Sequence, residues 1–430
     1  MNRNAHDKFD ERLIEMFNNG NIDMDYINTD LNKFITSRLY EYQLYHVYNM
    51  ISCIRNNNVS IDSSMTGTGK TYTSIATIKH LGLEPLIICP KNSVSMWKNV
   101  CDYFQVKPIS IVNIELIKNG GTYDMDFNKK KSTFLSVTEE GNIKWNFQKQ
   151  NNTIVIFDEA HKCKNYKSGN GKLLLSLKNI CKILLLSATL CDNPNGFTVF
   201  GYMLDFYNNI KRGSKWIKTL VEEQERTGNN NLIHKYIFPS KGSCMTMNDI
   251  PDKYPMNQIN AECYDVDPKC TVQIKKMYDV MLSKINNGEI HGEKLVSMLR
   301  ERQIIEYYKI PLIIDMANKY LEHNKSVVIF VNFVKTLDKL REHFDNNNTK
   351  YSFVYGKQTH DEIMNNIEMF QNNTNRIIIL TIKSGSSSIS LHDTDGKYSR
   401  VSIIIPTYSS IELIQTLGRI CRKGQKSPTL

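Results

Sequence analysis

The sequence lacks patterned cysteines. Its ten cysteines are scattered over 430 residues, and no two of them stand in a Cys-x-x-Cys arrangement. Several lie in apolar runs, as Cys89 does at the end of Leu86-Ile87-Ile88-Cys89. Zinc sites and disulfide frameworks have recognisable cysteine spacings, which are missing here. We therefore expect reduced thiols, an intracellular protein and no cysteine-based zinc site.

Long apolar runs are also missing. The segment Met1–Asp7 is polar and does not begin a signal-peptide core, and no uninterrupted apolar run reaches membrane-spanning length. We expect a soluble intracellular protein without a membrane partner, located in the nucleus if it is cellular and in the cytoplasm or virion if it is viral. Heavy use of Asn, Ile and Lys fits an AT-rich source such as a large DNA virus.

The composition has no extreme charge. The chain is 41% hydrophobic and 23% charged, which is typical of globular proteins and leaves room for two or three domains. The formal net charge of +10 suits a polyanionic partner, but a protein that is merely basic would have the same balance. The sequence leaves the oligomeric state open and is compatible with a monomer.

A phosphate-binding loop is present near the N-terminus. Small residues let backbone N–H groups turn towards phosphates, the lysine reaches the β- and γ-phosphates, and the hydroxyl after it can bind Mg²⁺. The pattern G-x-x-x-x-G-K-[ST] fits, with serine in place of the first glycine, over Ser64, Met65, Thr66, Gly67, Thr68, Gly69, Lys70 and Thr71.

The surroundings of the loop support this interpretation. A strand is expected over 59–61 and a helix over 71–80 that stops at Gly82, so the loop would lie at a helix N-terminus, where anions are favoured. Upstream, Gln43 opens a helical pattern. Its amide offers a donor and an acceptor, which suits adenine, although an isolated glutamine is usually a surface residue.

A buried strand over 153–157 ends in two adjacent carboxylates. Asp158 is expected to hold Mg²⁺ together with Thr71, and Glu159 to position and deprotonate the attacking water. Ala160 and His161 complete the predicted nucleotide-binding group. A further strand over 182–186 leads to the hydroxyls of residues 187–189, which can sense the γ-phosphate through the acidic pair.

Other parts of the first half carry weaker signals. A strand over 85–90 is followed by hydroxyl and basic groups that can contact nucleic-acid phosphates, and Trp97 is interpreted as a packing anchor. Residues 119–150 have weak periodicity and are expected to form a hairpin insertion. Basic clusters at 162–167 and 211–218 are either solvated faces or phosphate contacts.

The second half begins with a Pro-interrupted linker and long helices over about 240–309. Strands near 327–331, 351–355, 377–381 and 401–405 then alternate with helices, which predicts a second parallel sheet. A final helix is expected over 411–422. Arg419 and Arg422 would share one face of it and reach a phosphate, or else form an exposed basic helix end.

Taken together, these segments form an ordered series between about residues 39 and 425. It consists of Gln43, the 64–71 loop, Pro90–Trp97, Asp158–His161 with Lys162–Asn165, Ser187–Thr189, Ile250–Pro251, Ile329–Phe333, Lys383–Leu391 and Gln415–Gln425. The series resembles the superfamily 2 helicases and translocases, most closely their Swi2/Snf2-like branch. Its most specific part is the ending Gln-x-x-Gly-Arg-x-x-Arg-x-Gly-Gln.

The resemblance implies an α/β fold of two tandem RecA-like domains that enclose ATP. The expected parts are an N-terminal extension over 1–36, a first lobe over 37–240, a helical connection over 241–310 and a second lobe over 311–430. It also implies that Gln43 reads adenine and that Arg419 and Arg422 act as finger residues. Such residues make hydrolysis depend on lobe closure.

Three features depart from the family pattern. Ser64 replaces a glycine, but Lys70 and Thr71 remain and ATP binding is still expected. Residues 386–388 are serines where the second lobe's nucleic-acid contact normally has a glycine-rich turn. The chain ends at Leu430, where the family continues with another strand, so a minimal or truncated motor is expected.

The leading hypothesis is an ATP-dependent nucleic-acid motor, with DNA favoured over RNA because Swi2/Snf2-like members generally move on duplex DNA without separating it. An alternative is a nucleotide-dependent nucleic-acid-binding scaffold without efficient turnover. A transporter ATPase is less favoured, because no Leu-Ser-Gly-Gly-Gln signature is present.

Overall fold

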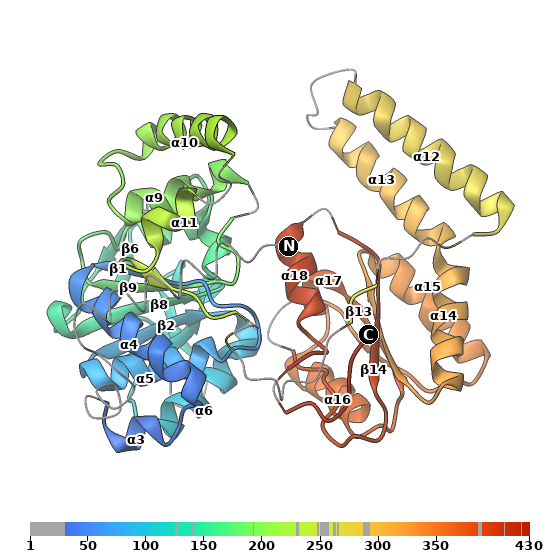
Figure 1. Cartoon of the computed structure of the whole chain (residues 1–430), viewed down its shortest axis with the longest axis horizontal. Coiled ribbons are helices and arrows are strands. Elements are labelled where there is room, and N and C mark those ends of the chain that lie inside the picture. The colour runs from blue at the N-terminus through green and yellow to red at the C-terminus, as the bar shows by residue number, and fades with distance from the viewer. Residues whose placement is uncertain are drawn as a thin grey trace. The chain divides into compact units, whose positions relative to one another are not determined.

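The computed structural model describes residues 31–430, except 125–127, 140, 192, 229–231, 247–248, 250–257, 261–263, 265, 287–292, 386–388, 408 and 423. The chain divides into two compact units, Met1–Pro251 and Asp252–Leu430 (Figure 1). Residues 1–30 of the predicted 1–36 extension, the Ile250–Pro251 linker and the serines at 386–388 lie outside the described residues. Of the described helices, none is both long and apolar enough to cross a bilayer.

Unit 1 is built on a parallel sheet. Its six strands lie in the order β10-β1-β9-β8-β2-β3. The predicted strands at 59–61, 85–90, 153–157 and 182–186 are all present, each with bounds shifted by one residue at most. The strands are β1 (Val59–Asp62), β2 (Glu84–Cys89), β3 (Ser110–Asn113), β8 (Thr153–Asp158), β9 (Lys182–Leu186) and β10 (Gly242–Ser243).

Side chains of these strands alternate between two hydrophobic layers, because neighbouring residues of a strand point to opposite faces. On one face, Ile87, Ile156 and Leu184 pack with the helices that precede β3. On the other face, Ile88 and Phe157 pack with the helices that follow β8. The helices of unit 1 are α3 (Lys33–Thr36), α4 (Glu41–Asn56), α5 (Lys70–Leu81), α6 (Val94–Tyr103), α7 (Ile114–Ile117), α8 (Gly169–Leu175), α9 (Thr198–Met203), α10 (Gly213–Thr227) and α11 (Leu232–Ile237).

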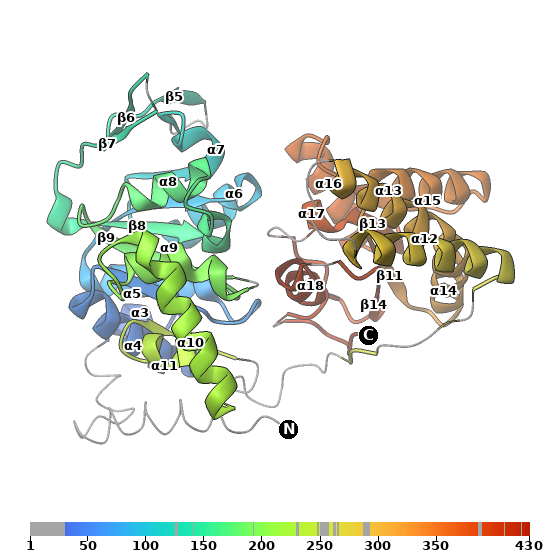
Figure 2. The ribbon, with the colours of Figure 1, turned by 90° about the horizontal axis from the view of Figure 1, so that it is seen from above.

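The expected insertion at 119–150 consists of two antiparallel hairpins, which gather at one end of unit 1 (Figure 2). Side chains fix them to the rest of the unit. Tyr123 donates its hydroxyl to Asn113 at 2.7 Å, and the Trp145 indole donates to Ser176 at 2.8 Å. The four strands are β4 (Gly121–Tyr123), β5 (Lys129–Lys131), β6 (Leu135–Val137) and β7 (Ile143–Trp145).

Unit 2 contains the second predicted parallel sheet, with strands in the order β12-β13-β11-β14. The strands are β11 (Ser326–Val331), β12 (Ser352–Val354), β13 (Ile377–Thr381) and β14 (Arg400–Ile404). Helices α14 (Ile310–Glu322) and α15 (Val334–Asn346) cover one face, and α16 (His360–Gln371) and α17 (Ile382–Gly385) cover the other. The predicted long helices are α12 (Pro268–Asn286) and α13 (Glu293–Tyr308), which lie side by side in both views (Figures 1 and 2).

The prediction for the last helix was wrong in its extent. Helix α18 covers Ser410–Leu417 and does not reach Arg422. Gly418, which has a low helix propensity, follows Leu417, and the Arg419 carbonyl accepts from the Leu391 N–H at 3.0 Å. The turn also buries Ile420 in the core of unit 2. Tertiary pairing and burial therefore end the helix before the arginines.

Candidate functional site

Three strands bring the predicted site of unit 1 together. In the register of the sheet, Asp62 at the end of β1 pairs with Leu186 of β9, and Leu186 pairs with Asp158 of β8. The phosphate loop, residues 187–189 and the acidic pair therefore leave the same edge of the sheet. The carboxyl edge of a parallel sheet is where open α/β proteins bind their ligands.

The loop leads directly into α5, which begins at Lys70 and ends at Leu81, and Gly82 caps it with a left-handed backbone of φ 65°. The Lys70 ammonium donates to the carbonyls of Ser64 and Met65, at 2.7 and 3.1 Å. Burial lowers the pKa of Lys70, although the carboxylates of Asp62, Glu159 and Asp158 oppose this shift. The loop thus folds around its own lysine, which is the group expected to bind phosphate.

Ser64, the departure from the glycine pattern, has a structural use. Its side chain is buried, and its Oγ accepts from the Met245 N–H at 2.9 Å. The next residue of the loop also bonds to Met245, since the Met65 N–H donates to the Met245 carbonyl at 2.8 Å. Ser64 does not have a positive φ, so glycine is not required at this position. The serine therefore ties the loop to the segment after β10.

Gln43 contacts the loop from α4. Its Nε2 donates to the Thr68 carbonyl at 2.9 Å, while its Oε1 accepts from the Tyr40 N–H at 2.9 Å. The side chain is 3% exposed. In this structure the amide therefore holds the loop, and the adenine-reading role expected from the family remains a prediction.

Gly69 is required at its position for two reasons. Its φ is +98°, and a Cβ built there would lie 2.3 Å from Gln43 Nε2. We expect Gly69→Ala to lose about 1–2 kcal/mol of stability through backbone strain and to weaken ADP binding, because Gln43 must leave the loop. Urea unfolding and ADP titration measure the two effects.

Gly82→Ala is the matched control for this prediction. Its φ is +65°, but nothing lies within 4 Å of the added Cβ. We expect a similar loss of stability with unchanged ADP affinity. Equal ADP affinities for the two variants would show that Gln43 and the loop are not coupled in this way.

Asp158 is held by a tryptophan. Trp97 on α6 is fully buried, and its Nε1 donates to Asp158 Oδ2 at 2.9 Å. Burial and the adjacent Glu159 carboxylate raise the pKa of Asp158 to about 6, against the opposing effect of Trp97. Trp97 therefore has two roles: it packs in the core, as predicted, and it orients the Asp158 carboxylate.

Glu159 begins a line of polar contacts across the edge of the sheet. Its Oε2 lies 3.2 Å from His161 Nδ1, which lies 3.3 Å from Ser187 Oγ. Ser187 Oγ donates to the Thr189 carbonyl at 2.7 Å. Glu159 itself has a left-handed backbone, with φ 57°. The predicted link between the acidic pair and residues 187–189 is therefore a set of direct contacts.

Two of the predicted nucleotide-binding residues cannot offer their side chains. Ala160 is 1% exposed and packs in the core of unit 1, and Thr68 is fully buried, with its hydroxyl donated to Met65 at 2.8 Å. Their contribution is limited to the backbone. Sequence reasoning in turn missed Asp62 and His46, a buried pair beneath the loop, because neither residue belongs to a recognisable motif.

The two arginines of unit 2 converge although they do not share a helix. Arg419 Nη1 and Arg422 Nη2 both donate to the Ile389 carbonyl, at 3.3 and 3.1 Å. Arg419 is 3% exposed, whereas Arg422 is partly exposed. The turn after α18 therefore brings the two guanidinium groups to one point, as a continuous helix was expected to do.

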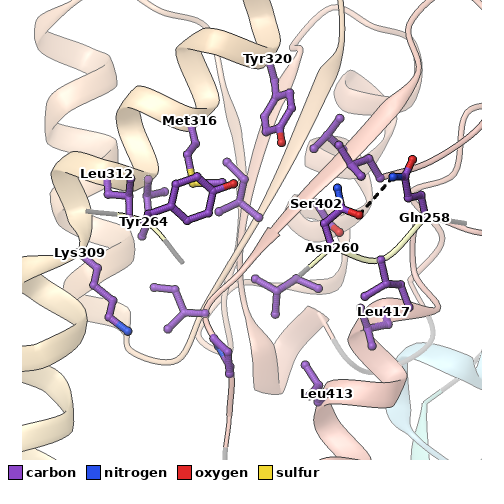
Figure 3. A pocket seen from close by; sticks show the side chains of 18 of the residues that line it. Gln258, Asn260, Tyr264, Lys309, Leu312, Met316, Tyr320, Ser402, Leu413 and Leu417 are labelled. Carbon is purple, nitrogen blue, oxygen red and sulfur yellow. Dashed lines mark hydrogen bonds between the residues drawn. The ribbon is translucent and has the colours of Figure 1, made fainter. Parts of the chain in front are cut away.

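A separate hollow of about 490 Å³ lies in unit 2 between α14, β14 and α18 (Figure 3). On one side of it Gln258 Nε2 donates to Asn260 Oδ1 at 3.2 Å, and Tyr264 and Met316 line the other side (Figure 3). Of the described side chains that line the hollow, that of Lys309 alone is charged. None of these side chains offers a carboxylate, thiol or imidazole suited to phosphate chemistry.

Family comparisons match both units. The family described as type III restriction enzyme, res subunit, matches residues 36–192, and the helicase conserved C-terminal domain matches residues 309–424. A putative ATP-dependent RNA helicase of Acanthamoeba polyphaga mimivirus is 32% identical, over 94% of this chain and 80% of its own length. The chain belongs to the superfamily 2 helicases.

Other relatives are more distant. A CHD3-type chromatin-remodeling factor of Arabidopsis thaliana is 24% identical over 93% of this chain and 35% of its own length. The Swi2/Snf2 ATPase core of Sulfolobus solfataricus, solved with dsDNA, is 17% identical with a TM-score of 0.39, covering 91% of this chain and 87% of that one. As a family member with both helicase domains, this helicase is an ATP hydrolase. It couples ATP hydrolysis to movement on nucleic acid or to its remodelling.

Proposed function

We propose that this helicase translocates on duplex DNA without separating its strands. The Gln415–Gln425 ending, the part of the sequence most specific for the Swi2/Snf2-like branch, supports duplex DNA. Chromatin-remodeling factors among its relatives support it too. The relatives named putative RNA helicases favour RNA instead, so the substrate must be tested directly.

The ATP-dependent part of this proposal rests on Lys70. In unit 1 it would bind the β- and γ-phosphates, replacing the carbonyls of Ser64 and Met65 with charge-assisted bonds to phosphate oxygens. Glu159 would accept the proton of the attacking water, and its contact with His161 keeps it at the edge of the sheet. In unit 2, Arg419 and Arg422 would stabilise the charge that develops on the transferred phosphate.

Magnesium fits the donor set of unit 1. Thr71 and Asp158 would supply one hydroxyl and one carboxylate. Among the described residues, no three His, Cys, Asp or Glu side chains form a cluster that could hold a metal ion by themselves. Mg²⁺ typically takes one or two protein ligands and completes its shell with phosphate oxygens and water. The ion would neutralise phosphate charge, and Trp97 would keep the carboxylate oriented towards it.

We expect Lys70→Ala to weaken ATP binding about a hundredfold, because the loop loses its only charged phosphate donor. Titration with a fluorescent ATP analogue measures the affinity. Lys79→Ala is the control, since Lys79 lies on the same helix but donates to Gln105 at its far end. Equal affinities for the two variants would contradict the role given to Lys70.

Two assays run in parallel test the substrate. We expect this helicase to displace the third strand of a DNA triplex in the presence of ATP, while leaving a plain duplex paired. Triplex displacement must be absent in Lys70→Ala and retained in Lys79→Ala. Efficient unwinding of an RNA or DNA duplex, without triplex displacement, would contradict the proposal and identify a strand-separating enzyme.

A further inference from the structure

A histidine and an aspartate are buried together beneath the phosphate loop. His46 lies one helical turn after Gln43 on α4, and Asp62 is the last residue of β1. His46 Nε2 lies 3.0 Å from Asp62 Oδ2, and the two side chains are 2% and 1% exposed. Buried ionisable groups are rare and costly unless they are paired, so this pair calls for an explanation.

The pair is connected to the loop by hydrogen bonds. Asp62 Oδ1 accepts from the Ser64 N–H at 2.9 Å, and the Ser64 carbonyl accepts from Lys70 Nζ at 2.7 Å. The line of contacts thus runs from His46 through Asp62 and Ser64 to the lysine. Asp62 holds the first turn of the loop in place, and His46 holds Asp62.

The position of Asp62 is electrostatically unusual. A carboxylate beneath a loop that binds phosphates repels the ligand unless a cation neutralises it. Burial alone would raise the pKa of Asp62, but His46, Lys70 and the Ser64 hydrogen bond keep it below its ordinary value. Asp62 is therefore ionised, and two groups are available to balance its charge.

Few other charges face the pair. Lys70 comes from α5 and the Cys244 thiol from the segment after β10, while Asp158 at the end of β8 and Glu159 just after it act on Lys70. Burial raises the pKa of Cys244 to about 12, so this thiol is neutral. Once Lys70 turns to bound phosphates, His46 is the remaining described group in contact with Asp62 that can carry a positive charge.

His46 can take up a proton without changing its contact. An ionised carboxylate only accepts hydrogen bonds, so the imidazole hydrogen must be on Nε2. The other nitrogen, Nδ1, is buried and has no hydrogen-bond partner among the described residues. A proton added there makes the ring cationic and leaves the Nε2–Oδ2 contact as it is.

We propose that His46 is a positioning residue of the nucleotide site, which takes up a proton at Nδ1 when phosphates bind and so balances the buried Asp62 carboxylate. The inference rests on the proposed role of the 64–71 loop and of Lys70. By linkage, a proton that nucleotide binding favours must itself favour nucleotide binding. Affinity should therefore fall as the pH rises.

The test is ADP binding, with Mg²⁺, by the full chain between about pH 6 and about pH 8.5, a range that spans imidazole titration. Calorimetry in buffers of different ionisation enthalpy also gives the protons taken up. His46→Gln keeps a donor for Asp62 but cannot be protonated. His80→Gln is the matched control, since His80 lies at the far end of α5 and contacts Arg55. Protonation of ADP itself contributes equally to the proton uptake of the wild type and of each variant, so it cancels when they are compared.

We expect the wild type and His80→Gln to take up protons on binding ADP, and His46→Gln to take up fewer. At the acidic end the His46→Gln variant should bind ADP about fivefold more weakly or worse, and at the alkaline end it should match the wild type. Proton uptake and affinity equal to wild type at every pH would overturn the proposal. A loss of affinity that is the same at every pH would also overturn it, because it would show a purely structural role.

A second variant keeps the proposal testable if His46→Gln folds poorly. Asp62→Asn removes the charge that needs balancing, so its ADP affinity should be independent of imidazole titration and no weaker than that of the wild type at the alkaline end. A pH dependence like that of the wild type would overturn the proposal. If the wild type binds ADP but does not differ from these two variants in its pH dependence, only this inference is contradicted. If the wild type and Lys70→Ala bind ADP with equal affinity, the proposed function is contradicted.

Discussion

The Arg422→Lys variant is expected to hydrolyse ATP about a thousandfold more slowly than the wild type, in the range found for finger arginines. Lysine keeps the charge but cannot make the two-pronged contact of a guanidinium with phosphate oxygens. Arg422 is partly exposed and donates to the Ile389 carbonyl, so its head group lies where a ligand can compete for it. Nucleotide affinity should change little, because the arginine acts on charge that develops during the reaction. Steady-state ATPase rates with saturating DNA measure the effect.

Arg419 needs a separate readout, because it is 3% exposed and its replacement can disturb the fold. Arg419→Lys should therefore be compared in both ATPase rate and thermal unfolding. Arg300→Lys, on the exposed side of α13, is the control and should leave both unchanged. ATPase rates of the Arg422→Lys and Arg300→Lys variants that differ by less than about tenfold would contradict the finger role.

The Glu159→Gln variant is expected to lose about a thousandfold in kcat, within the range for a general base. Glutamine keeps the shape of the side chain but cannot accept the proton of the attacking water. ATP should still bind, since Lys70 and Thr71 are untouched. The variant should therefore trap ATP, which single-turnover kinetics can separate from a loss of binding.

Glu115→Gln provides the control for this substitution. Glu115 lies on α7 of the same unit, is mostly exposed and pairs with Lys118. Its replacement should leave kcat within about twofold of the wild type, as is usual for exposed ion pairs. Retention of more than about a tenth of wild-type kcat by Glu159→Gln would exclude Glu159 as the base.

Much of the fold could be predicted because the central strands are continuous apolar runs. Residues 153–157 and 327–331 are buried on both faces of their sheets, so nearly every side chain is apolar and the strands can be located without any tertiary information. The acidic pair follows such a strand directly, whereas the phosphate loop follows the short strand β1, which also contains Ser60 and Asp62. Their positions at the sheet edge were therefore fixed by strand ends alone.

The features that could not be predicted depend on contacts between distant segments. His46 and Asp62 meet because α4 packs on β1, and Trp97 reaches Asp158 from α6. None of these residues has a local pattern that indicates its partner. The end of α18 is a similar case, since the bond from Leu391 to the Arg419 carbonyl competes with the helix and cannot be recognised in the sequence around Gly418.

We expect nucleic acid to stimulate ATP hydrolysis by this chain. The most direct test is the ATPase rate of the full chain alone, with duplex DNA, with single-stranded DNA and with RNA, at equal nucleotide concentrations. We predict that nucleic acid stimulates the rate and that duplex DNA does so most, with stimulation lost in Arg422→Lys. Absence of ATP hydrolysis with all three nucleic acids, or a rate that none of them raises, would contradict this expectation.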